Sequence, residues 1–80
     1  MNKTIKLTYP ILFNGQEYKE FSIRRSKIKD RLAISKLVCS EEEKEIRLLA
    51  NLCDVAPDII MELDEKDYQS LQKAYMDFFK

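Results

Sequence analysis

The sequence predicts an α+β fold in which an N-terminal β-hairpin is followed by three to four helices packed on it. Two runs near the N-terminus alternate apolar and polar residues, which is the period of strands with one buried face. An Asn-Gly pair lies between these runs, as in tight hairpin turns. The remaining chain repeats apolar residues at intervals of three and four behind good capping residues, which predicts helices. We expect one domain spanning residues 1–80.

The predicted hairpin covers residues 3–25. Ile5 and Leu7 alternate with polar residues in the first run, and Phe21 and Ile23 do so in the second. These four side chains can share one face only if the pairing brings them together. We therefore expect Leu7 opposite Phe21 and Ile5 opposite Ile23.

The register of this hairpin requires a special device. A regular two-residue turn at 14–15 would put the apolar residues on opposite faces, because a shift of one residue exchanges the faces. A three-residue loop over 13–15 with a left-handed Gly15 would correct the register. A bulge near Pro10 would serve equally, since proline cannot donate to a ladder.

The first two helices are predicted over 27–37 and 41–53. Ser26 is a candidate N-cap for the first, whose inward residues are expected to include Ile28 and Leu32. Ser40 and Glu43 have the spacing of a capping box and open the second helix. Its core stripe is expected to consist of Ile46, Leu49, Ala50 and Cys53.

A short helix is predicted over 57–62, and the last helix over 65–79. Proline is favoured in a first helical turn, as at Pro57. Asp64 is a good N-cap for the last helix, and Asp67 can reach back toward it. The core stripe of that helix is expected to consist of Tyr68, Leu71, Tyr75 and Phe78.

Composition excludes several functions. The chain has 14 basic and 14 acidic residues, so no net charge attracts nucleic acid or an anionic membrane. No apolar run approaches the ~20 residues that span a bilayer, and we expect a cytosolic protein. Histidine is absent, which removes the commonest general base and metal ligand. We therefore expect no catalysis, no metal and no cofactor, and we read Cys39 and Cys53 as reduced thiols.

A basic cluster between Arg24 and Arg31 raises the alternative of DNA binding through a helix-turn-helix. The helix that would enter the groove begins with the run Glu41-Glu42-Glu43, which DNA would repel. This acidic run is explained by its place at a helix start, where it meets the positive end of the dipole.

Apolar residues exceed what the two long helices need for their core stripes. Leu48 and Leu52 flank one stripe, and Met76 and Phe79 flank the other. Adjoining apolar residues outside a core mark a partner site. Together they favour a face that receives an amphipathic partner helix or a second copy of the chain.

Several motifs, taken in order and spacing, resemble the small tail assembly chaperones of contractile-tailed bacteriophages, which include Mu-like and P2-like proteins. The matching features are Leu7 with Pro10-Ile11 and Gly15, Phe21-Ser22-Ile23-Arg24-Arg25 with Asp30, Leu49-Ala50 with Leu52, and Leu63-Asp64 with Asp67-Tyr68, Leu71 and Phe78. The chain departs from the family pattern at 26–29 and 53–54.

The resemblance implies a non-catalytic protein of the host cytoplasm that binds the helical tape-measure protein during tail morphogenesis. A longer frameshifted form often accompanies the short product in related phages, so the chain itself or that form is a further candidate partner. The residues expected to contribute to the binding face are Leu48, Leu52, Tyr75, Met76, Phe78 and Phe79. Alternative functions are a self-associating or regulatory interaction module unrelated to tails and, less favoured, a DNA-binding regulator.

Overall fold

The computed structural model describes residues 2–80 and confirms the α+β class. A two-stranded antiparallel hairpin is followed by four helices. The elements are β1 (Asn2–Phe13), β2 (Gln16–Arg24), α1 (Ile28–Ser35), α2 (Glu41–Cys53), α3 (Pro57–Met61) and α4 (Glu65–Asp77).

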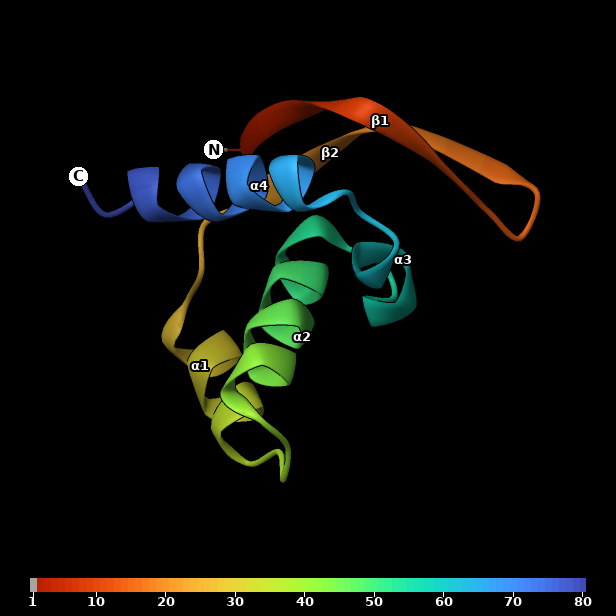
Figure 1. Cartoon of the computed structure of the whole chain (residues 1–80). Coiled ribbons are helices and arrows are strands. Elements are labelled where there is room, and N and C mark those ends of the chain that lie inside the picture. The colour runs from red at the N-terminus through yellow and green to blue at the C-terminus, as the bar shows by residue number, and fades with distance from the viewer. Residues whose placement is uncertain (1) are drawn as a thin grey trace.

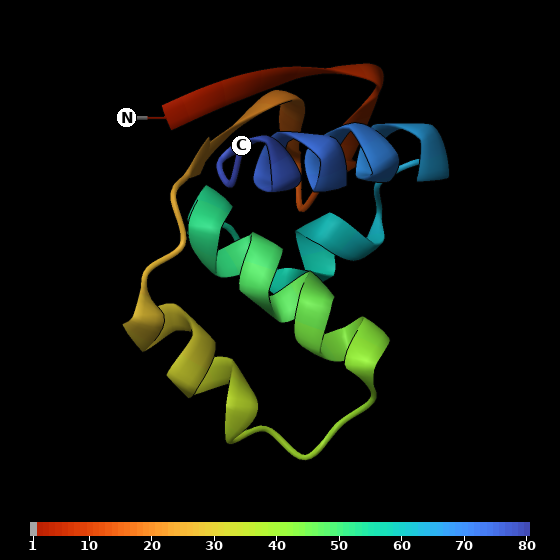
Figure 2. The same ribbon diagram turned by 90° about the vertical axis from the view of Figure 1, so that its left-hand side faces the viewer.

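The elements stack on one side of the hairpin (Figure 1). Helix α4 lies directly beneath the strands, and α2 descends from it with α3 beside its upper end. Helix α1 packs along α2 at the far side from the hairpin tip, as the turned view shows (Figure 2). The core lies where the hairpin, α2, α3 and α4 meet, and its largest fully buried apolar side chains are Ile23, Leu49, Ile60 and Leu71.

The hairpin turn is the two-residue type. Phe13 pairs with Gln16, and both residues between them have left-handed backbone angles, with φ 51° at Asn14 and 78° at Gly15. Asparagine and glycine tolerate this region best, which is why they dominate such turns. Of the two devices left open by the sequence, the three-residue loop is therefore not the one used.

The alternative device, a bulge near Pro10, is confirmed. Pairing is regular from Asn2 to Lys6 and again from Ile11 to Phe13, and it shifts between these segments, where residues 7–10 stand against Lys19. The shift is larger than one residue. Ile5 consequently pairs with Phe21, and Lys3 takes the place opposite Ile23 that Ile5 was expected to fill.

A carboxylate from α4 completes the irregular part of β1. Asp67 accepts hydrogen bonds from the backbone N–H of Thr8 at 2.8 Å and of Tyr9 at 2.9 Å. Its side chain was expected to reach back to the helix start, where Asp64 instead accepts from the Lys66 N–H at 3.0 Å. Asp67 is 1% exposed, so its charge is stabilised inside the protein by β1.

The environment of Asp67 lowers its pKa. Burial is the largest single influence and raises the pKa, but the N–H groups of Thr8 and Tyr9, together with the Thr8 hydroxyl and the Lys66 charge, hold the pKa below the ordinary value. The carboxylate therefore stays ionised in the folded protein at neutral pH, where it is the better acceptor.

Replacing Asp67 tests this link. Asp67→Asn turns one acceptor oxygen into an N–H donor that faces a backbone N–H, so we expect a loss of about 3 kcal/mol in the free energy of unfolding. Urea unfolding at pH 7 followed by circular dichroism measures it. The matched control is Glu65→Gln, because Glu65 is exposed in the same helical turn, and it should change stability by less than about 0.5 kcal/mol. Equal effects of the two substitutions would contradict the assignment.

Candidate functional site

The six residues expected at the binding face divide into three groups. Met76 and Phe79 are 58% and 56% exposed. Leu48 and Tyr75 are half-buried. Leu52 and Phe78 belong to the core, at 2% and 7% exposed.

Leu52 was expected to lie outside the core stripe of α2, and its burial is a correction, whereas Phe78 is buried as its place in the core stripe of α4 predicts. The C-terminal end of α2 is enclosed by β2 on one side and α3 on another, so its residues are buried on more than one face. Leu52 faces this enclosure. Phe78 is covered by two cations, with the Lys3 ammonium 5.1 Å and the Arg25 guanidinium 5.5 Å from its ring centre. Neither side chain offers surface to a partner in this fold.

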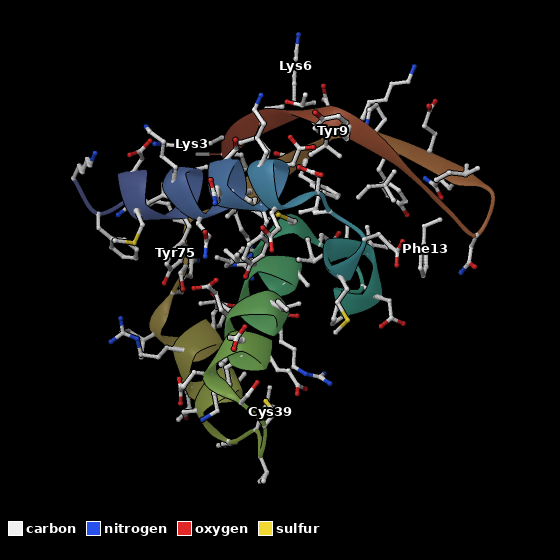
Figure 3. All side chains as sticks on the ribbon, viewed as in Figure 1. Lys3, Lys6, Tyr9, Phe13, Cys39 and Tyr75 are labelled. Carbon is white, nitrogen blue, oxygen red and sulfur yellow. The ribbon has the colours of Figure 1, made fainter. Side chains whose placement is uncertain are left out.

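The four other residues line hollows between three helices, and two of these hollows share lining residues with the largest. The largest, of about 460 Å³, lies between α1, α2 and the side chain of Tyr75. Figure 3 shows Tyr75 pointing from α4 toward α1 and α2. A second hollow of about 240 Å³ shares Leu48 and Tyr75 with the first and adds Met76. A third, of about 330 Å³, shares Arg31 with the first and adds Phe79.

We refer to these three hollows together as the three-helix groove. Its apolar lining residues are Ile28, Ile34, Leu48, Leu49, Tyr75, Met76 and Phe79. The rings of Tyr75 and Phe79 meet edge to face with their centres 5.2 Å apart, a favourable aromatic geometry.

A polar junction holds the α2 and α4 walls of the groove together. The Oε1 atom of Glu45 accepts from the Tyr68 hydroxyl at 2.6 Å and from the Gln72 amide at 2.7 Å. Burial, and then the hydrogen bond to the Glu45 carboxylate, raise the pKa of Tyr68 well above its ordinary value. The hydroxyl thus remains a donor, and Tyr75 is kept next to Leu48.

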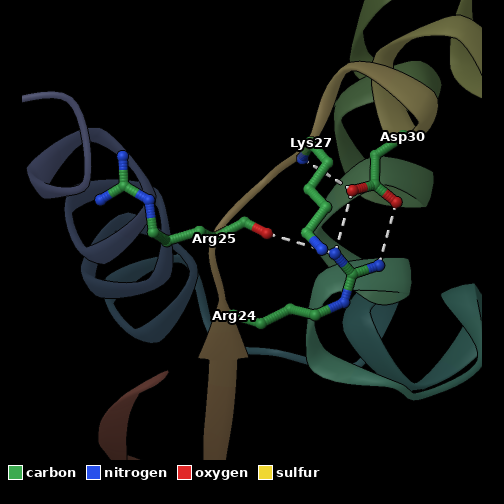
Figure 4. A network of polar contacts seen from close by, with 4 residues as sticks. All are labelled: Arg24, Arg25, Lys27 and Asp30. Atoms are coloured by element: carbon green, nitrogen blue, oxygen red, sulfur yellow. Dashed lines mark hydrogen bonds and ion pairs between the residues drawn. The ribbon is translucent and has the colours of Figure 1, made fainter. Parts of the chain in front are cut away.

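The α1 wall is held by one buried carboxylate. Asp30 is 7% exposed. Its carboxylate accepts hydrogen bonds from the two terminal guanidinium nitrogens of Arg24, both at 2.9 Å, and from the backbone N–H of Lys27 at 2.8 Å (Figure 4). These bonds join the end of β2 to the first turn of α1. Lys27 is the N-cap residue of α1, so the expected cap at Ser26 is wrong. The backbone N–H of this N-cap residue donates to Asp30, which lies in the first turn of the helix.

Helix α1 shows an apolar surface that the sequence pattern placed inward. Ile28 is 77% exposed and Leu32 is 55% exposed. The half-buried residue of this helix that faces the groove is Ile34, and Arg31 lies beside it. The sequence analysis did not single out Ile34, and it considered Arg31 only as part of the basic cluster. The weak apolar periodicity of α1 was the available signal that no single face of it is buried.

The thiols of the chain and its potential metal ligands can be placed as well. Both cysteines are free thiols, and burial raises the pKa of Cys53 to about 11, so its thiol is not activated. Within residues 2–80, no cluster of three carboxylate or thiol side chains could hold a metal ion. No helix in the same range is long and apolar enough to cross a membrane.

Comparison with known proteins gives one family. The family model described as "Phage tail assembly chaperone proteins, E, or 41 or 14" matches residues 4–80. The matched range includes both strands from Thr4 onward and all four helices, so the three-helix groove lies entirely within it. No curated protein and no solved structure gives a significant match.

The anchoring of α1 is testable through pH. Hydrogen bonds from Arg24, and then from the Lys27 N–H, lower the pKa of Asp30 to about 2. A carboxyl with a lowered folded-state pKa contributes stability above its unfolded value, near pH 4, and loses it as pH falls through the folded value. Hydrogen exchange protection of the α1 amides should therefore decline between about pH 4 and about pH 2.

The variant Asp30→Asn should show low α1 protection already at pH 7, while α4 amides stay protected. Asp58→Asn is a suitable control, because Asp58 is an exposed carboxylate in the first turn of α3. Full α1 protection in Asp30→Asn would exclude the anchoring role.

Proposed function

The chain belongs to the phage tail assembly chaperones, and from this premise we propose that it binds the tape-measure protein during tail morphogenesis. The family membership confirms the resemblance read from the motifs and makes the protein a non-catalytic assembly factor whose partners are tail proteins. The finer identification of the partner is our proposal. We place the activity in the cytoplasm of the host bacterium.

The observation that carries the proposal is the pair Met76 and Phe79. Each is more than half exposed on the last turns of α4 and the residues after it, and both adjoin half-buried Tyr75 in the three-helix groove. An apolar groove between helices is suited to the apolar face of an amphipathic helix. A tape-measure protein is a long chain of such helices, and its apolar faces need cover until tube subunits surround it.

The free energy of binding that the groove can supply is suited to reversible binding of a client. Completing the burial of one large apolar side chain contributes about 1–2 kcal/mol when half of it starts exposed. The few partly exposed residues of the groove therefore keep the affinity well short of picomolar once the cost of ordering two chains is subtracted. A chaperone must release its client when the tail tube forms, and a limited affinity permits release.

The proposal is tested by placing charge in the groove. We expect Met76→Glu to weaken binding of the tape-measure protein at least about tenfold, because a carboxylate would be desolvated in the complex. Co-purification of the two co-expressed proteins gives a first reading, and titration calorimetry with the bound segment gives the affinity. Phe79→Glu should act in the same way.

Met61→Glu is the matched control. Met61 is a methionine of similar exposure, 52% against 58%, but it ends α3 and does not line the groove. It should bind normally, and all three variants should keep the wild-type circular dichroism spectrum. Undiminished binding in a folded Met76→Glu, Phe79→Glu double variant would reject the proposed function.

A further inference from the structure

The three-helix groove carries charge of opposite sign at its two ends. The hollow at Phe79 is lined by Lys27 and Arg31 and by no acidic residue. The hollow at Met76 is lined by Glu45 and by no basic residue. We call these the basic end and the acidic end of the groove.

Neither end is neutralised by an ion pair within residues 2–80. Lys27 and Arg31 take part in no salt bridge of the described chain, and Glu45 accepts its two hydrogen bonds from the neutral groups of Tyr68 and Gln72. The central hollow contains both signs, because Arg31 and Glu45 also line it and its Lys44 ammonium lies 3.7 Å from Glu41. Among the charged residues that line the groove, those outside this ion pair are therefore basic toward Phe79, at Lys27 and Arg31, and acidic toward Met76, at Glu45.

An apolar stripe alone does not fix the direction of a bound helix, since its side chains fit similar hollows after reversal. Charge does fix it, because reversal brings like charges together at both ends. We infer that the groove holds a tape-measure helix in one direction, with acidic residues of the helix at the basic end and basic residues at the acidic end. This inference rests on the proposed function and specifies the segment that is bound.

The test uses designed helical peptides as probes. Each has about 18 residues, or five turns, and a leucine stripe. One carries glutamates in its first half and lysines in its second, and a neutral version carries glutamine at all these positions. We expect the charged peptide to bind the wild-type protein more tightly and to lose this advantage as salt is raised.

Reversing the basic end gives the decisive variant. Lys27→Glu with Arg31→Glu should weaken binding of the charged peptide about tenfold and leave the neutral peptide within about twofold. The matched control is Lys29→Glu with Lys36→Glu, which makes the same change in net charge on exposed positions of the same region that do not line the groove. The control should bind both peptides as the wild type does.

The direction of the bound peptide is measured by NMR, from the broadening that a nitroxide label on the charged peptide causes in the amide signals of the protein. A label at its acidic end should broaden the amide signals of Ile28 and Phe79, and a label at its basic end those of Leu48 and Met76. Equal broadening from both labels, equal losses in the variant and its control, or binding of neither peptide by a protein that still co-purifies with the tape measure would overturn the inference. Dissociation of a wild-type dimer by the Lys27→Glu, Arg31→Glu variant would show that a second copy fills the groove and would overturn it too.

These outcomes are separable from failure of the proposed function. Loss of directional binding with intact co-purification of the tape-measure protein removes only the inference about orientation. Normal co-purification by the folded double variant at Met76 and Phe79 removes the proposed function itself.

Discussion

The hydrogen bonds between the Asp67 carboxylate and the backbone of β1 are the constraint on which the rest of the structure depends. The ladder between the strands is interrupted at residues 7–10, and buried N–H groups without acceptors are costly. Asp67 supplies acceptors for Thr8 and Tyr9 from the first turn of α4. This fixes α4 beneath the hairpin, and the direction of α4 in turn delivers Tyr75, two turns later, to the groove.

Local signals explain how much of the fold could be predicted. The Ser40 hydroxyl accepts from the Glu43 N–H at 3.1 Å, and Asp64 caps α4, as their spacing indicates. These interactions join near neighbours, so they are visible in sequence. The register of the hairpin could be predicted only in part. The need for a bulge followed from face alternation, but its size depends on a carboxylate from the far end of the chain, which no local pattern reveals.

The candidate site was predictable to the extent that exposure follows from helix periodicity. Met76 and Phe79 lie outside the stripe of α4 and are exposed. Leu52 also lies outside its stripe, yet it is buried because the hairpin and α3 enclose the end of α2. Periodicity tells which residues share a face but not how many faces are covered. The α1 wall escaped prediction for a related reason, since α1 buries no apolar stripe of its own and is anchored at its start by the ion pair of Arg24 with Asp30.

The Asp67 bridge also has a consequence for biosynthesis. Asp67 lies 59 positions from Thr8 and 58 from Tyr9 in the sequence, so the strand made first cannot exchange water for these protein acceptors until the last helix has left the ribosome. A two-stranded hairpin is marginal by itself in water, and contacts this distant in sequence form late. The nascent chain therefore emerges with an unfinished sheet, and any product cut short before α4 would keep it exposed to aggregation and proteolysis.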